Sequence, residues 1–243
     1  MTIGSTTHII YLVVTLAFFV LSAWAVSKMN EKWQNVCFIF GTLICSGGIF
    51  FRYGMGLTWE GSITLKTLAR ELLQVCSFNF VLLPLMLIKK CEIARQYAFF
   101  FSMFAACTTL FSVSRSFANV EWYSTTLLNS WLNHVFAIAV PIWMIASRRF
   151  KPQKKYVLPV TACVFVYFTL SYVIQERLIL KGVMTVENSL SFIYRTMGVP
   201  VLDWFMELIP YPYWYLYPLL PLMIGFFYLL AFAFKKYKLK ESK

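Results

Sequence analysis

Two side chains in this sequence could together carry nucleophilic chemistry: the thiol of Cys76 and the imidazole of His134. A thiol in an apolar site is largely protonated at neutral pH, so it becomes a nucleophile only when a neighbouring base takes its proton. A cysteine activated by a histidine can attack an ester carbonyl and form a thioester, which then passes its acyl group to a hydroxyl, an amine or water. The pair therefore predicts acyl transfer, provided that the fold brings the two side chains together.

Carboxamide side chains lie close in sequence to both groups. An amide can orient an imidazole or donate a hydrogen bond to the oxyanion that forms when an ester is attacked. The sequence does not choose between these roles. The candidates are Gln74 and Asn79 near the cysteine, and Asn129 and Asn133 near the histidine.

The segments that must position these groups are long and apolar. Cys76 belongs to the run from Glu71 to Lys90, and His134 belongs to the run from Leu127 to Ser147. At 1.5 Å per helical residue, Cys76 lies ~6 Å and His134 ~10 Å inside the same membrane surface. Polar groups at membrane depth usually face a cavity or another helix, so a functional role is the default reading. A histidine that only packs against a neighbouring helix is the alternative.

Composition indicates the class of protein. Of the 243 residues, 60% are hydrophobic, 19% are aromatic and only 13% are charged, which is typical of a polytopic helical membrane protein. The formal charge of +12 could suggest nucleic acid, but the basic residues lie at the ends of apolar spans. We therefore expect no nucleic-acid partner and a single transmembrane domain over 1–243, surrounded by membrane lipids.

The apolar runs predict an all-α bundle of seven transmembrane helices. A shorter amphipathic helix, at about 198–209, is expected to lie in the membrane interface because its apolar residues recur at helical spacing. In the second span, Gly41, Gly47 and Gly48 offer close helix contact. The seven spans are expected at about 8–27, 35–51, 71–89, 96–113, 127–147, 156–174 and 215–234.

The distribution of basic residues predicts the orientation. Of the 22 Lys and Arg residues, 15 lie on the side that holds the carboxyl terminus and the connections following the first, third and fifth spans. By the positive-inside rule, this side is cytoplasmic and the amino terminus is outside. We expect a multi-pass protein of the cell membrane, most simply the plasma membrane of a bacterium.

The remaining sequence features do not predict a cofactor. The six cysteines show no paired spacing, so neither a disulfide framework nor a metal site is expected. There is no glycine-rich phosphate loop either. Arginines on the outer side are weak candidates for binding a substrate phosphate, although they could equally be ordinary interface anchors. They are Arg52, Arg70, Arg115 and Arg195.

Several of these stretches resemble the YwaF-like family of integral membrane proteins, which has bacterial members and a vertebrate branch regarded as phospholipid acyltransferases. The resemblance rests on three stretches: Gln74-Val75-Cys76 through Pro84-Leu85, the Asn133-His134 pair, and the run Pro210 to Trp214 before the last span. It covers about Leu68 to Phe234 and implies that Cys76 and His134 are the catalytic pair. The family usually has a histidine where this chain has Gln74.

Two other classes of function stay open. A transporter of a neutral solute could use proline-broken spans, although Asp and Glu are absent from the interior of every span. A structural or assembly protein would need neither the thiol nor the imidazole. A rhodopsin is excluded because the last span, Tyr215 to Phe234, has no lysine to bind retinal.

Overall fold

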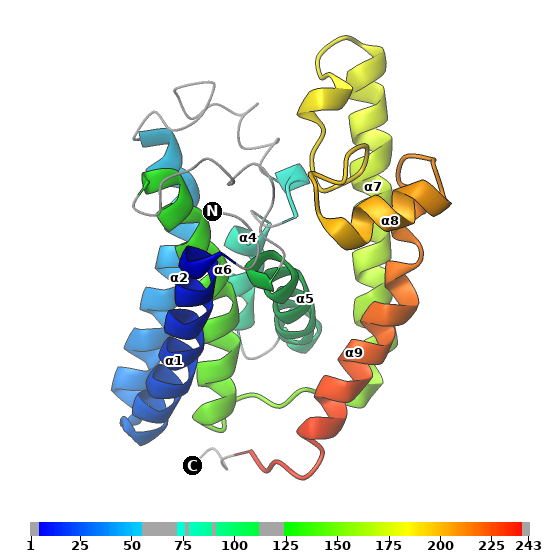
Figure 1. The fold of residues 1–243 in the computed structure, drawn as a ribbon. Helices are drawn as coiled ribbons and strands as arrows, with labels where there is room; N and C mark the ends of the chain where they lie inside the picture. Colours follow the sequence, from blue (N-terminus) through cyan, green and yellow to red (C-terminus); the bar gives the residue numbers. More distant parts are fainter. Residues whose placement is uncertain (1–4, 55–71, 76–77, 89–90, 112–123, 240–243) are drawn as a thin grey trace.

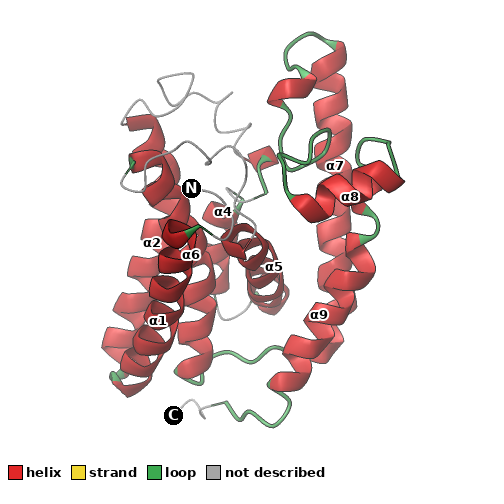
Figure 2. Ribbon diagram, in the orientation of Figure 1, coloured by secondary structure: helices red, strands yellow, loops and turns green. Residues whose placement is uncertain are grey.

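The computed structural model describes residues 5–54, 72–75, 78–88, 91–111 and 124–239. Over this part of the chain every regular element is helical and none is a strand (Figure 2). Short 3₁₀ turns lie at η2 (Lys154–Tyr156), η3 (Val186–Asn188) and η4 (Trp214–Leu216). The longer helices are α1 (Thr6–Lys28), α2 (Glu31–Gly54), α4 (Asn79–Met86), α5 (Glu92–Phe111), α6 (Thr125–Ala146), α7 (Val157–Leu180), α8 (Pro200–Leu208) and α9 (Leu219–Ala233).

The helix α6 lies at the centre of one group of helices. It packs against α1, α2, α4 and α5, and it is the most buried of the long apolar helices. The helices α7 and α9 lie side by side in a second group, and α8 contacts the η4 turn that precedes α9 (Figure 1). The helix α5 contacts α6 as well as α7 and α9, so it joins the two groups.

Four of the described helices are long and apolar enough to cross a membrane: Thr6–Lys28, Leu127–Ala146, Lys154–Leu180 and Trp214–Ala233. They coincide with the first, fifth, sixth and last predicted spans. The all-helical class of the prediction is confirmed over the described residues. The number of seven spans and the orientation stay predictions.

The predicted third span differs from the structure. The sequence predicts a continuous helix over 71–89, but α4 begins only at Asn79 and has 8 residues, which amounts to ~12 Å of helix. The residues before it turn at Gln74 and Val75. One physical reason is that the Val75 amide donates to the Ser191 hydroxyl, 2.7 Å away, instead of to a helical carbonyl. Pro84 inside α4 also removes one helical donor.

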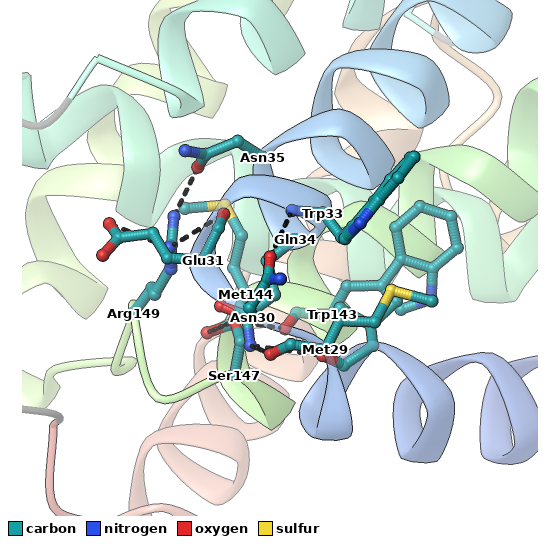
Figure 3. A network of polar contacts seen from close by, with 11 residues as sticks. Met29, Asn30, Glu31, Trp33, Gln34, Asn35, Trp143, Met144, Ser147 and Arg149 are labelled. Atoms are coloured by element: carbon teal, nitrogen blue, oxygen red, sulfur yellow. Dashed lines mark hydrogen bonds and ion pairs between the residues drawn. The ribbon is translucent and has the colours of Figure 1, made fainter.

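Polar contacts tie α1, α2 and α6 together at one end of the bundle (Figure 3). The buried Gln34 donates to the Val26 and Met29 carbonyls, 3.2 and 3.0 Å away, and so fixes the turn between α1 and α2. From the end of α6, Arg149 forms an ion pair of 2.9 Å with Glu31 of α2 and also donates to Asn35.

Further polar contacts at the same end reach α5 and the carboxyl-terminal segment. Arg95 of α5 donates to the Arg149 carbonyl at 2.8 Å, and Lys151 donates to the Lys235 carbonyl at 2.9 Å. This end therefore gathers basic connections that the charge distribution assigns to one side of the membrane. That this side is the cytoplasm stays a prediction.

The glycines of α2 differ in what they approach. A Cβ added at Gly41 would lie 2.7 Å from Val140 and 2.8 Å from Trp143, both on α6. At Gly48 it would lie 3.1 Å from the Asn129 amide oxygen, whereas at Gly47 it would meet nothing within 4 Å. Close helix packing therefore explains Gly41 and Gly48 but not Gly47.

The predicted helix at 198–209 is present as α8, with a proline in its first turn. Leu202 and Phe205 are buried on one face, while Trp204 and Leu208 are exposed on the other. A helix with an exposed tryptophan and leucine is typical of one that lies against lipid. Its location in the membrane interface stays a prediction.

Candidate functional site

His134 lies in the middle of α6 and is buried, with 7% of its surface exposed. Its Nδ1 atom lies 2.7 Å from the Ser130 carbonyl oxygen, one helical turn earlier. Because a carbonyl oxygen can only accept a hydrogen bond, Nδ1 must carry the proton. In the neutral ring Nε2 then holds the lone pair, so Nε2 is the atom that can take a proton.

Asn129 and Asn133 lie on α6 and face α2. The Asn133 amide donates to the Cys45 carbonyl at 3.2 Å, and the Cys45 thiol lies 3.5 Å from the Asn133 carbonyl oxygen. The Asn129 amide oxygen lies against Gly48, and Asn129 is buried. These contacts join α2 to α6 within about one and a half turns of His134, so they hold the helix that carries the imidazole. The Oδ1 atom of Asn133 is buried, and it accepts no hydrogen bond from the part of the chain that the structure describes.

Cys76 and Ser77 lie outside the described residues, so the predicted contact between Cys76 and His134 stays a prediction. The residues on either side of Cys76 are described. Val75 is buried at 4% exposure, and Asn79 begins α4, which packs against α6. Val75 and Val135, the sequence neighbours of the two candidate catalytic residues, belong to the same large buried apolar cluster.

The short segment before Cys76 is held by a polar network that we call the Ser191 clamp. It consists of the Leu72–Val75 backbone, the side chains of Tyr167, Ser171 and Gln175 on α7, and Ser191. The Ser191 hydroxyl accepts from the Val75 amide at 2.7 Å and donates to the Leu73 carbonyl. Both hydrogen-bonding capacities of this buried hydroxyl are therefore used by the residues that lead into Cys76.

Three further side chains, those of Tyr167, Gln175 and Gln74, contribute hydrogen bonds to the clamp. The Tyr167 hydroxyl donates to the Leu72 carbonyl at 3.0 Å. The side chain of Gln175, which is fully buried, accepts from the Leu190 amide at 2.7 Å and donates to the Ser171 hydroxyl at 2.8 Å. The Gln74 amide oxygen accepts from the Ser191 backbone amide at 3.4 Å. The position of Gln74 is thus tied to the clamp.

Ser191 and the residue that follows it, Phe192, have an unusual backbone conformation. Ser191 has a φ of 56° and Phe192 a φ of 60°, in the left-handed region that is uncommon for residues other than glycine. Such conformations persist when surrounding contacts over-determine them, and they concentrate at functional sites. The buried hydrogen bonds of Gln175 and Ser191 supply those contacts here.

The other candidate residues lie apart from this region or outside the described residues. Arg195 is exposed and donates to the Glu187 carbonyl. Arg52 lies in the last turns of α2, whereas Arg70 and Arg115 lie outside the described residues. The phosphate-binding role of these four arginines stays a prediction. Within the described part of the chain, no three His, Cys, Asp or Glu side chains gather as metal ligands would.

Sequence reasoning missed the Ser191 clamp. The predicted sixth span ended at Ile174, one residue before Gln175, because polarity rises there. The signal that could have found it is the spacing of Ser171 and Gln175, four residues apart and so on one helix face. Its partner Ser191 lies in a connection without periodicity, so no pattern points to it.

Comparison with known proteins identifies the family of this chain. A family model described as the TMEM164 family matches residues 3–231, which is nearly the whole sequence. No curated protein and no solved structure matches the chain. The matched range includes Cys76, His134 and every member of the Ser191 clamp. The chain therefore belongs to the TMEM164 family, and its apolar helices are those of a membrane protein.

Proposed function

We propose that this protein is a membrane-embedded acyltransferase in which Cys76 is the nucleophile and His134 the general base. The observation that supports it most directly is the hydrogen bond from His134 Nδ1 to the Ser130 carbonyl, because it leaves the lone pair on Nε2. The resemblance to the YwaF-like family, with its branch regarded as phospholipid acyltransferases, supports the same chemistry. The protein would act in the cell membrane, most simply a bacterial plasma membrane.

The proposed reaction has two balanced half-reactions. First, His134 takes the thiol proton and the Cys76 sulfur attacks the ester carbonyl of a lipid. The carbon–oxygen bond to the lysolipid breaks, the thioester forms, and the leaving oxygen takes the proton from the imidazolium. In the second half, an acceptor hydroxyl gives its proton to His134 and attacks the thioester, and the released thiolate recovers that proton.

The described contacts suggest how the protein would support this reaction. The Ser191 clamp fixes the backbone just before Cys76, while the contacts of Asn129 and Asn133 with α2 hold the helix of His134. Positioning of this kind accounts for a large part of catalysis by covalent mechanisms. The side-chain amide that donates a hydrogen bond to the oxyanion is proposed to be one of Gln74, Asn79, Asn129 and Asn133.

The test is to trap the thioester. The purified protein in vesicles of a radiolabelled phosphatidylcholine should acquire an acyl label on Cys76 that hydroxylamine releases. Cys76→Ala should abolish the label, and His134→Gln should slow its formation by about 10²–10⁴-fold, the usual contribution of a general base.

The chain offers a matched control for each variant. Cys163→Ala removes an exposed cysteine of α7, and His8→Gln removes the other histidine, on α1; both should leave the label unchanged. A label that survives Cys76→Ala would refute the proposal. Saturable solute uptake that tolerates Cys76→Ser, without any acyl label, would instead support a transporter. A protein that shows neither the acyl label nor solute uptake would support a structural role.

A further inference from the structure

An apolar cavity of about 150 Å³ lies between α5, α7 and α9, under α8. Its walls are aliphatic and aromatic, and among the lining side chains only Tyr213 and Tyr217 carry a polar atom. The Tyr213 hydroxyl lies 2.6 Å from the Thr169 hydroxyl, so it is already hydrogen-bonded. Such walls offer few hydrogen bonds to a polar solute, which would be desolvated without compensation. A hydrocarbon has no polar group to desolvate and so enters without this penalty.

The size of the cavity limits what it can hold. A buried cavity of about 150 Å³ lined by leucine, isoleucine and phenylalanine stays dry and binds benzene. The cavity found here therefore has room for a guest of about six carbon atoms. That is too small for a sterol or for a whole lipid, but it suits a segment of one hydrocarbon chain.

The position of the cavity relates it to the candidate site. Val75 forms part of one wall, and its amide is fixed by Ser191. Phe192, which follows Ser191, forms another part. The cavity therefore borders the residue that immediately precedes Cys76. Its other lining residues include Ala105 of α5 and Leu220 and Met223 of α9.

The occupant follows from the surroundings. Two of the helices that line the cavity, α7 and α9, belong to segments long and apolar enough to cross a membrane. Val201, another lining residue, is 41% exposed, so the wall under α8 includes a partly open apolar residue. The apolar molecules present at such a surface are the chains of membrane lipids.

We propose that this cavity binds a segment of one acyl chain of the phospholipid donor and that its volume limits which chains the protein accepts. The proposal rests on the function proposed above and adds to it a binding site and a group of residues that set specificity. Ala105 is the wall residue to test, because a phenyl ring added there has the six carbons of the expected guest.

The experiment uses the full chain in vesicles of dioleoylphosphatidylcholine with a trace of phosphatidylcholine that carries a diazirine near the end of one acyl chain. On irradiation, the crosslinks should map to α5 and α9. Because binding precedes chemistry, Cys76→Ala should label as well as the unaltered chain. Ala105→Phe should lower this labelling about tenfold, since its ring occupies the cavity.

Two further variants keep the test independent of one substitution. Leu220→Phe fills the cavity from α9 and should also lower the labelling, while Ala17→Phe, on an exposed part of α1, should not. Only variants whose melting temperature and monodispersity match those of the unaltered chain are compared. Equal labelling of Ala105→Phe, Leu220→Phe and the unaltered chain would overturn the proposal, as would crosslinks that map only to α1.

The outcomes separate this inference from the proposed function. Crosslinks in the cavity without any thioester on Cys76 would support the proposed binding site and refute the proposed acyltransferase activity. A thioester that forms with the same acyl-chain preference in the unaltered protein and in Ala105→Phe would support the proposed activity. It would refute the cavity as the site that binds the acyl chain. A thioester that shifts towards shorter chains in Ala105→Phe supports both.

Discussion

The hydroxyl of Ser191 lies 2.7 Å from the amide nitrogen of Val75, although the two residues are 116 positions apart in the sequence. Through this bond, a connection that follows α7 fixes the turn that leads into Cys76. Ser191 is fully buried, and its hydroxyl also donates to the Leu73 carbonyl. The relationship makes Ser191 a positioning residue in the proposed mechanism.

Two replacements of Ser191 should distinguish the contribution of its hydroxyl to the free energy of unfolding from the strain of its backbone conformation. Ser191→Ala leaves the buried Val75 amide without its acceptor, which should lower the free energy of unfolding by about 1–3 kcal/mol. Ser191→Gly loses the same hydroxyl but relieves the left-handed φ of 56°. The glycine variant should therefore be about 1 kcal/mol more stable than the alanine variant.

Thermal unfolding in detergent, followed by tryptophan fluorescence, measures this order. If the glycine variant melts below the alanine variant, the backbone at Ser191 is not strained as described. The positioning role has a separate readout: in the folded alanine variant, formation of the Cys76 adduct should slow, while labelling of Cys163 by a thiol reagent should be unchanged.

Removing Gln175 should loosen the connection between α7 and α8. Its side chain bonds both polar atoms of the Leu190 backbone, at 2.7 and 3.3 Å. Leaving those groups unpaired in Gln175→Ala should cost about 1–3 kcal/mol, so the population of the locally open form should rise about 5-fold to 150-fold. Trypsin cleavage after Lys181 and Arg195 should accelerate in proportion, because proteolysis follows the population of the open form.

Gln153→Ala is the matched control for the Gln175 variant. Gln153 also makes a side-chain hydrogen bond, which it donates to Glu92 at 3.1 Å, but it lies beyond the opposite end of α7. Its removal should leave cleavage at Arg195 unchanged. Equal acceleration in both variants would mean that global stability, and not the Gln175 contacts, controls this connection.

The two glycines Gly41 and Gly47 should respond to alanine in opposite directions. A methyl group at Gly41 would lie 2.7 and 2.8 Å from side-chain atoms of α6, so Gly41→Ala should cost about 1–3 kcal/mol through overpacking. Gly47 faces open space, so Gly47→Ala should be neutral or stabilise α2 by about 0.5–1 kcal/mol.

Melting temperatures of the two alanine variants under identical detergent conditions test this contrast. The comparison is internally controlled because both glycines lie on α2 and receive the same methyl group. A Gly41→Ala protein as stable as the Gly47→Ala protein would contradict the close approach of α2 and α6 at this point.

Tyr213 should titrate late. Burial raises the pKa of Tyr213 to about 12, with a further contribution from Tyr217 and an opposing one from the hydrogen bond with Thr169. An unfolded chain loses this phenol proton near pH 10. The folded protein therefore holds this proton more tightly than the unfolded chain does. The resulting contribution to the free energy of unfolding is complete below about pH 10 and is lost as the pH rises towards about 12.

Tyrosinate absorbance measures the titration, taken as the difference between the unaltered chain and Tyr213→Phe. The difference signal should have its midpoint near 12 in the folded protein and near 10 in denaturant. A midpoint near 10 in the folded protein would show that Tyr213 is open to water and would weaken the description of the region beside the cavity.

The sequence by itself determined the helical class and most of the helices, because apolar runs of this length have few other stable states in a membrane. It also singled out His134, since a histidine in an apolar span is chemically conspicuous. Its prediction of a continuous helix over 71–89 differs from α4 at Asn79–Met86, because hydropathy does not register that Val75 bonds to Ser191.

Only the tertiary structure decided which polar groups meet. Gly41 and Gly47 look alike in the sequence, yet only Gly41 faces α6, because the face of a helix that meets a neighbour depends on how the helices pack. The Ser191 clamp and its contacts join positions 72–75, 167–175 and 190–191. Local periodicity carries no information about contacts over such separations, since folding and not sequence spacing brings those backbone segments together.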